Sequence, residues 1–159
     1  MAKLSHLDAE GKARMVDVSG KDVTERIAVA RGTIFMRPET LSLIMEKKVE
    51  KGDVFSVARV AGILAAKKTS ELIPMCHPLN ITSVEISLSP QQNPPRVEIE
   101  AVVKVTGKTG VEMEAMTAAA VSGLTIYDMC KAVDREMTLG DIRLVKKSGG
   151  KSGTFIRKE

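Results

Sequence analysis

The stretch ITSVEISLSPQQNPPRVEIEAV, residues 81–102, decides the fold class of this chain. Apolar and polar residues alternate from Ile81 to Leu88 and again from Val97 to Val102, as expected of two strands that each bury one face. The segment 90–95 between them is rich in proline and glutamine, which predicts a loop. We therefore expect an antiparallel β-hairpin here.

The residues on either side of the hairpin predict an α+β domain. Upstream, we expect an extended segment over 24–35, a short helix beginning at Pro38, and a longer helix over 53–66 whose first residue, an aspartate, is the N-cap. Downstream, we expect a long helix over roughly 111–136 with an Ala-rich middle suited to close packing, and a last strand over 142–145. The order is that of a ferredoxin-like βαββαβ sandwich, in which an antiparallel sheet packs on helices.

Length and composition fit one domain, 1–159, with an N-terminal arm over 1–22 and a Gly/Lys-rich C-terminal tail over 146–159 that we expect to hold no fixed structure by itself. The arm is polar apart from a short apolar stretch, MVDV, at 15–18. No apolar run approaches the roughly 20 residues of a membrane span, and no signal segment follows the first charges. Two cysteines are too few for a disulfide framework, so we expect a cytoplasmic protein with reduced thiols.

Aromatic residues and charge argue against a nucleic-acid partner. The chain has no Trp, one Tyr and three Phe, so it lacks the stacking surface that binds single strands. Its net charge of +4 is spread along the sequence rather than concentrated in one run. This pattern suits a small anionic ligand better than a duplex, although a scattered excess of lysine most often serves solubility alone.

A histidine and a thiol stand between two prolines in the segment IPMCHPL, residues 73–79. Each proline fixes its own φ and biases the preceding residue away from helix, so Met75, Cys76 and His77 lie in a stiff, non-helical segment. A rigid turn that presents an imidazole suits proton transfer or substrate binding. The alternative is a connecting loop whose histidine is merely exposed.

Two glycine-containing segments resemble phosphate-binding loops only in part. Gly107-Lys108-Thr109 and Gly150-Lys151-Ser152 match the end of the pattern G-x-x-x-x-G-K-[ST], but valines (Val102 and Val145) occupy the position of its first glycine. Neither segment is therefore a nucleotide-hydrolysing P-loop. Both remain candidate anion sites, because glycines let backbone N–H groups converge and lysine adds charge. For residues 146–151 a flexible basic tail is the equal alternative.

The long helix carries acidic residues at both of its ends. Glu112 and Glu114 lie in its first turn, where they also complement the helix dipole, and Asp128 and Lys131 near its end are spaced as a surface ion pair or as a proton-transfer couple. The separation between Glu114 and Asp128 corresponds to about 21 Å along a helix. One small substrate cannot easily contact both residues within a single subunit. The two cysteines and His77 lack paired C-x-x-C spacing, so no metal site is expected.

Six ordered segments resemble the molybdenum cofactor biosynthesis protein C family, the cyclic pyranopterin monophosphate synthases. The likeness runs from about residue 15 to residue 153. The segments are 51–55, 58–63, 73–79, 106–115, 124–132 and 147–153.

The resemblance implies a lyase. Its substrate would be 3′,8-cyclo-7,8-dihydroguanosine 5′-triphosphate, which rearranges to cyclic pyranopterin monophosphate with release of diphosphate. The steps are proton transfers, for which carboxylates, an imidazole and lysines of depressed pKa suffice without a redox cofactor. No cofactor is therefore expected, with Mg²⁺ beside the triphosphate left open. The family is ferredoxin-like and forms a homo-hexamer, a trimer of dimers, with active sites at subunit interfaces.

The resemblance also implies roles for individual residues. Asp128 and Lys131 would be the catalytic acid–base couple, with Lys51 contributing across the subunit interface. Lys147, together with Lys108, would stabilise the departing diphosphate. The residues that would hold the purine-derived part are Met75, Cys76, His77, Met113 and Glu114. Glu112 would be a further substrate-binding residue.

Two rival functions fit the same fold. A non-catalytic nucleotide- or metabolite-sensing domain would need residues that bind but no proton donors, and fold alone does not separate it from an enzyme. An RNA-binding module with the same strand order would need stacking aromatics that the chain lacks.

Overall fold

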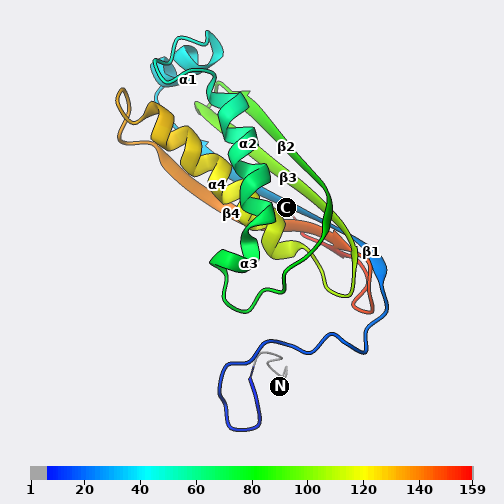
Figure 1. Ribbon diagram of the computed structural model, residues 1–159. Helices are drawn as coiled ribbons and strands as arrows, with labels where there is room; N and C mark the ends of the chain where they lie inside the picture. Colours follow the sequence, from blue (N-terminus) through cyan, green and yellow to red (C-terminus); the bar gives the residue numbers. More distant parts are fainter. Residues whose placement is uncertain (1–6, 159) are drawn as a thin grey trace.

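The computed structural model describes residues 7–158 (Figure 1). Residues 1–6 of the predicted arm, with His6, and Glu159 at the end of the predicted tail lie outside the described residues. The elements follow in chain order: β1 Thr24–Phe35, α1 Pro38–Met45, α2 Val54–Lys67, α3 Thr69–Leu72, β2 Ile81–Gln91, β3 Arg96–Gly107, α4 Glu112–Cys130, β4 Thr138–Ser148 and β5 Phe155–Ile156.

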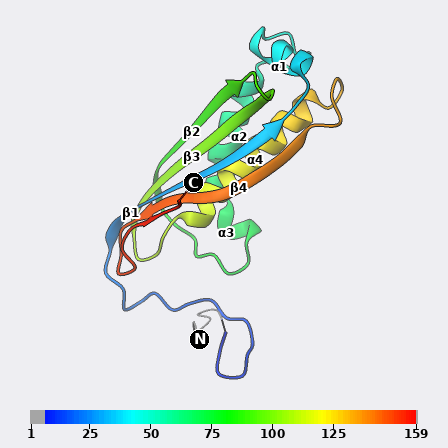
Figure 2. The ribbon, with the colours of Figure 1, turned by 180° about the vertical axis from the view of Figure 1, so that it is seen from behind.

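The strands form one antiparallel sheet in the order β2-β3-β1-β4-β5. The first four positions are the strand order of a ferredoxin-like sandwich, which confirms the predicted fold class. Helices α2 and α4 cover one face of the sheet, and the view from behind shows the other face without helices (Figures 1 and 2).

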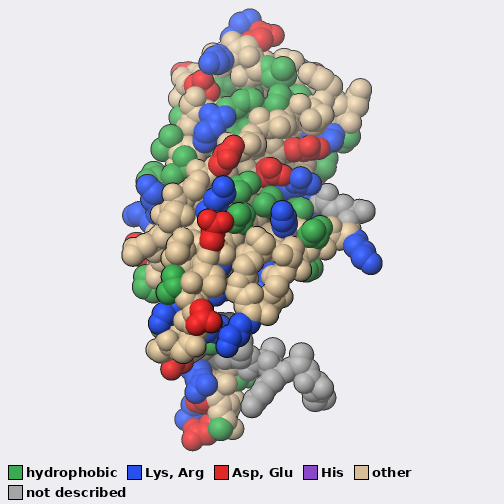
Figure 3. All heavy atoms as spheres, turned by 90° about the vertical axis from the view of Figure 1, so that its right-hand side faces the viewer, with side chains coloured by type: hydrophobic (Ala, Val, Ile, Leu, Met, Phe, Trp, Pro, Cys, Tyr) green, Lys and Arg blue, Asp and Glu red, His purple; other side chains and the backbone are tan. Residues whose placement is uncertain are grey.

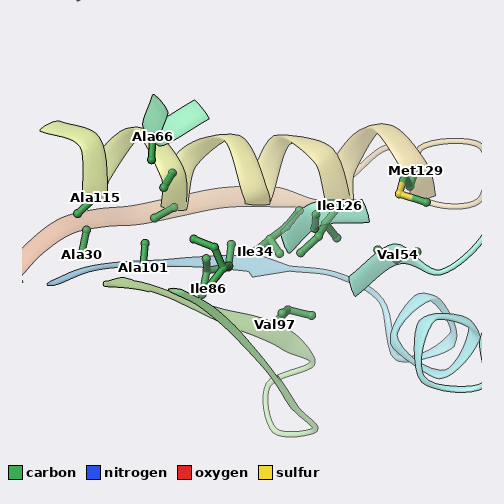
Figure 4. Close-up of a cluster of buried hydrophobic side chains, with 14 of the residues drawn as sticks. Ala30, Ile34, Val54, Ala66, Ile86, Val97, Ala101, Ala115, Ile126 and Met129 are labelled. Atoms are coloured by element: carbon green, nitrogen blue, oxygen red, sulfur yellow. The ribbon is translucent and has the colours of Figure 1, made fainter. Parts of the chain in front are cut away.

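The core lies between the sheet and helices α2 and α4 and is lined by small residues where the layers meet (Figure 4). Ala30 and Ala101 are paired on β1 and β3, and Ala115 is fully buried on the helix above them. Gly62 of α2 lies so close to Ser122 of α4 that a Cβ there would collide with the serine side chain. Small side chains therefore let both helices approach closely, as the Ala-rich middle of the long helix predicts.

Several predicted boundaries differ from the structure. Strand β2 continues through Pro90, which we expected in the loop; β2 is an edge strand, where a missing N–H costs least. Helix α4 ends at Cys130 rather than near 136, because the N–H groups of Val133 and Asp134 turn back to the Cys130 carbonyl. Strand β4 runs to Ser148 because β1 supplies backbone partners along its length. The expectation of a tail without fixed structure is therefore wrong for its first residues and also for β5, which pairs with Lys146 and Lys147.

Candidate active site

A cavity of about 510 Å³ opens beside the first turn of α4. Its walls come from three separate parts of the chain: the arm, the Pro-framed segment 73–79, and the loop and first turn at 109–114. All five residues that we predicted to hold the purine-derived part of the substrate line this cavity, and so does the predicted substrate-binding residue Glu112. The five are Met75, Cys76, His77, Met113 and Glu114.

Glu114 is the buried acid of this first cavity, with only 4% of its surface exposed. Burial raises the pKa of its carboxyl group, and the charge of Glu112 raises it further. Burial and then the Glu114 charge likewise raise the pKa of the Cys76 thiol, which disfavours a nucleophilic thiolate. Glu114 and Cys76 therefore give the cavity a partly apolar wall. The carboxyl group of Glu114 holds its proton more tightly than an exposed glutamate does.

His77 contacts the N-terminal arm, because its Nε2 lies 2.7 Å from the carbonyl oxygen of Val16. Two further arm residues, Val18 and Lys21, also line the first cavity. Reasoning from sequence assigned no role to the arm, although its MVDV stretch was a visible signal: alternate residues of an extended segment face the same side.

Lys147 reaches the same region from β4. Its Nζ lies 3.1 Å from Oε1 of Glu112 and donates to Oγ of Ser152 at 2.9 Å. The structure thus brings Lys147, which we predicted to stabilise the departing diphosphate, to the edge of the first cavity. Lys108 instead donates to the carbonyl oxygen of Ser19 at 2.8 Å.

A second cavity, of about 340 Å³, lies next to the first, and Lys21 lines both. It is basic on balance, since its wall contains the cations Lys21, Arg26 and Lys151 but a single acidic residue, Asp22. Within the described residues, the buried Oγ1 of Thr24, another wall residue, has no hydrogen-bond partner. Gly150 lies against the Arg26 guanidinium, which a Cβ at this position would displace, and its φ of 74° is a backbone conformation that favours glycine.

Arg26 is a site residue that reasoning from sequence missed. Its Nε donates to the Gly107 carbonyl at 3.0 Å and its Nη2 to the Lys108 carbonyl at 3.2 Å, so it joins β1 to the loop before α4. An arginine within a strand carries no local signal of such a role. Arg26 comes close to Gly149 and Gly150 only because β1 pairs with β3 on one side and with β4 on the other.

The predicted catalytic residues meet at the opposite end of α4. Asp128 Oδ1 lies 2.7 Å from Lys131 Nζ, and its Oδ2 lies 3.0 Å from Lys51 Nζ. Lys131 and then Lys51 lower the pKa of Asp128 to about 2 by hydrogen bonds and charge. Asp128 in turn raises the pKa of Lys131, so the resting group is a carboxylate held between two ammonium groups.

The arrangement of these lysines within the single chain differs from two expectations. We expected Lys51 to reach the couple across a subunit interface, but it contacts Asp128 of its own chain, because the turn before α2 lies against the end of α4. We also expected catalytic lysines of depressed pKa, whereas Lys131 is exposed and paired with a carboxylate, which raises its pKa.

The two groups of residues stay apart within one chain. Helix α4 is unbroken from Glu112 to Cys130, so Glu114 and Asp128 are about 21 Å apart along its axis. None of Lys51, Asp128 and Lys131 lines the first cavity. The unbroken helix therefore confirms the predicted separation between Glu114 and Asp128, and the view that one small substrate cannot easily contact both within a subunit stays a prediction.

Asp134, which we did not single out, is a buried carboxylate close to this second group, with 1% of its surface exposed. Its Oδ2 accepts the Arg37 N–H at 2.9 Å and the Thr40 hydroxyl at 3.0 Å. Burial opposes ionisation, but these bonds and the Glu136 N–H lower its pKa overall. Asp134 therefore holds the start of α1 against the end of α4.

Metal-binding groups and membrane helices were sought among residues 7–158. There, no set of three or more His, Cys, Asp or Glu side chains is placed to hold a metal ion. No helix in that range has the length and apolar character to cross a membrane.

Comparison with known proteins gives consistent matches over nearly the whole chain. The MoaC family profile matches residues 15–150. The chain is 65% identical over 158 residues to the cyclic pyranopterin monophosphate synthase of Pelotomaculum thermopropionicum, covering 99% of this chain and 93% of that protein. It is 59% identical to the synthase of the same name from Magnetococcus marinus, covering 99% and 96%, and 60% identical to that of Dinoroseobacter shibae, covering 98% of each.

Proposed function

The chain belongs to the MoaC family, and we propose that it converts 3′,8-cyclo-7,8-dihydroguanosine 5′-triphosphate to cyclic pyranopterin monophosphate and diphosphate. It is an enzyme of molybdenum cofactor biosynthesis, a lyase whose relatives carry the name of the product. The observation that carries the substrate assignment is the pair of adjoining cavities, one acidic and partly apolar, the other basic.

The first cavity suits the purine-derived part of the substrate. A guanine edge presents N–H donors, and Glu112 and Glu114 supply carboxylate acceptors at the cavity wall. Met75 and Met113 offer apolar, adaptable surface for the flat ring system. His77 supplies an imidazole that can donate or accept a hydrogen bond at the cavity wall.

The second cavity suits the triphosphate. Lys21, Arg26 and Lys151 are cations, and the hydroxyl of Thr24 is buried without a partner within the described residues. Phosphate oxygens are acceptors that would satisfy these donors. Because Lys21 lines both cavities, a substrate with its ring in the first can extend its phosphates into the second, and Lys147 lies near the boundary to stabilise the departing diphosphate.

The Lys51–Asp128–Lys131 group supplies the acid–base chemistry in this proposal. Lys131, whose pKa is raised, rests as an ammonium group and is suited to donate a proton. A lysine acts as a base only when its pKa falls, and this requires the Asp128 contact to loosen or another cation to approach as substrate binds. The rearrangement moves protons and the phosphoryl group and needs no redox step, so we propose no resident cofactor and leave Mg²⁺ beside the triphosphate open.

The active site is proposed to be composite, with the cavities of one subunit facing the Lys51–Asp128–Lys131 group of another in a hexamer built as a trimer of dimers. The separation of about 21 Å along α4 supports this arrangement. Exposed apolar side chains on the outer helices also support it, since they are the kind of surface that subunit contacts cover. They are Val57, Val60 and Leu64 on α2 and Leu124 on α4.

We place the protein in the cytoplasm without a nucleic-acid or membrane partner. Cys76 and Cys130 are both free thiols, which suits a reducing compartment. Lysine, arginine and acidic side chains are interspersed over the face in Figure 3, a surface that offers no continuous basic path for a nucleic acid.

Turnover by the purified chain tests the activity. Incubated with the cyclic triphosphate but without iron, flavin or nicotinamide, it should release diphosphate and form a pterin, detected after oxidation by its fluorescence. Binding without release of diphosphate would contradict the proposal and favour a metabolite-sensing domain.

Subunit mixing tests the composite site. Glu114→Ala and Asp128→Ala proteins should each be inactive, and exchange of their subunits should restore part of the activity, because some sites then receive both intact groups. A fully active monomer in sedimentation at working concentration would contradict the arrangement.

A further inference from the structure

The N-terminal arm, residues 7–22 of the described chain, has no part in the reaction as proposed above, apart from Lys21. None of these residues belongs to the buried core, and among them the only β-bridge joins Leu7 to Ala13. Figures 1 and 2 show the arm leaving β1 and crossing beneath the end of the body that carries the loop after α3. Its position therefore needs an explanation other than folding stability.

Side chains and backbone hold the arm against the first cavity. Val16 and Val18 line the cavity and are half-buried, whereas Asp17 between them is exposed, as expected of alternate residues in an extended segment. Asp17 accepts the Ser19 N–H at 2.9 Å, and the Ser19 carbonyl accepts Lys108 Nζ at 2.8 Å. Residues 16–19 are thus held against the rest of the protein by the two valines in the cavity wall and by the hydrogen bond from Lys108 to the Ser19 carbonyl.

The contact with His77 is chemically directional. A carbonyl oxygen can only accept a hydrogen bond, so at 2.7 Å from the Val16 oxygen the Nε2 atom of His77 carries the hydrogen. In a neutral imidazole the other nitrogen, Nδ1, then keeps its lone pair and is left to accept. The contact also restrains rotation of the ring about χ2, a torsion that is otherwise broad.

We propose that Val16 is a positioning residue whose carbonyl oxygen holds His77 in the Nε2–H form and in one ring orientation for substrate binding. Pro74 and Pro78 stiffen the backbone around His77 but leave its ring free to turn, and the arm supplies the missing restraint. The inference rests on the proposed function, in which His77 binds the purine-derived part of the substrate.

Two truncations that differ only in the stretch of interest test the contact directly. A chain beginning at residue 13 lacks the Leu7–Ala13 bridge but keeps Val16, and a chain beginning at residue 20 lacks Val16 but keeps Lys21. Both lack His6, so His77 is the only histidine in either protein. Imidazole ¹⁵N labelling followed by NMR then reports on this ring alone and needs neither substrate nor turnover.

The chain from residue 13 should show a His77 Nε2–H signal protected from exchange with water, and the chain from residue 20 should lose it. The full-length variant with Val16→Gly and Val18→Gly, which loosens the arm without deleting it, should weaken the signal as well. Persistence of the protected signal in the chain from residue 20 would overturn the proposal, whatever the outcome of the turnover assay.

A kinetic comparison separates positioning from a merely structural role. In the chain with His77, loss of residues 1–19 should raise KM by about tenfold, because a badly oriented His77 binds substrate and transition state equally less well. In a His77→Ala background the same loss should raise KM by less than about twofold, because no imidazole remains to be positioned. The chain from residue 13 should keep the KM of the intact protein. Equal increases in both backgrounds would show that the arm does not act through His77.

Discussion

The two ends of α4 carry carboxylates in opposite environments. At the first turn, Glu114 is buried at the wall of a cavity, and burial raises its pKa. At the last turn, Asp128 is exposed between two lysines, which lower its pKa to about 2. The comparison shows that burial at one end and charged partners at the other move the pKa values of two carboxyl groups on the same helix in opposite directions.

The largest expected effect is on turnover at the exposed end. Lys131→Ala, Asp128→Ala and Lys51→Ala should each lower turnover at least about 10²-fold, the usual contribution of general acid–base groups. Circular dichroism should stay unchanged, because exposed ion pairs add little to stability. Lys48→Ala, which removes an exposed lysine paired with Glu46 at 2.6 Å, is the matched control and should keep normal turnover. Near-normal rates in all three variants would reduce the group to a surface ion pair.

The next effect is on stability, and it contrasts a buried carboxylate with the exposed one. Asp134→Ala should lower the free energy of unfolding by about 2–3 kcal/mol, because it leaves the buried Thr40 hydroxyl and the Arg37 N–H without their acceptor. Denaturant unfolding at fixed protein concentration measures this loss. Asp128→Ala should change the unfolding midpoint little, and equal midpoints for the two variants would contradict the contrast.

A smaller effect is expected in ligand binding near the buried end. Lys147→Ala should weaken the affinity for the triphosphate substrate about tenfold, as expected for one charge-assisted hydrogen bond, and leave that for the pterin product nearly unchanged. Part of the loss should fade at high salt, because exposed charges are screened. Calorimetry with both ligands measures it, with Lys104→Ala on the exposed side of β3 as the control. Equal losses for substrate and product would show that Lys147 does not bind the phosphates.

The smallest effect is a pair of opposite pH dependences. Because the pKa of Glu114 is raised on folding, its contribution to stability is present at acid pH and is lost as pH rises through the folded-state pKa; Glu114→Gln should therefore gain stability relative to the parent protein as pH rises to neutral. Because the pKa of Asp128 is lowered, its contribution is present at neutral pH and is lost as pH falls toward about 2. Asp128→Asn should therefore be less stable than the parent at neutral pH and equal to it near pH 2. Melting temperatures across this range measure both differences, and parallel curves for the two variants would contradict the comparison.

The sequence by itself determined the fold class and most of the elements. Alternation over 81–102 predicted a hairpin because neighbouring side chains of a strand point to opposite faces, a property of the local backbone. The same holds for the N-cap at Asp53, whose side chain accepts the Ser56 N–H three residues later. The Pro-framed segment and the acidic first turn of the long helix were also visible, and they are walls of the first cavity.

Only the tertiary structure decided how these parts combine. Arg26 reaches the glycine turn through strand pairing, Lys51 meets Asp128 where two elements far apart in sequence pack together, and Val16 reaches His77 from the arm. The end of α4 likewise depends on Asp134, whose partners on and before α1 lie nearly a hundred residues upstream. The physical reason is that periodicity and capping act over a few residues, whereas cavities, buried carboxylates and pKa shifts arise from groups that only the folded chain brings together.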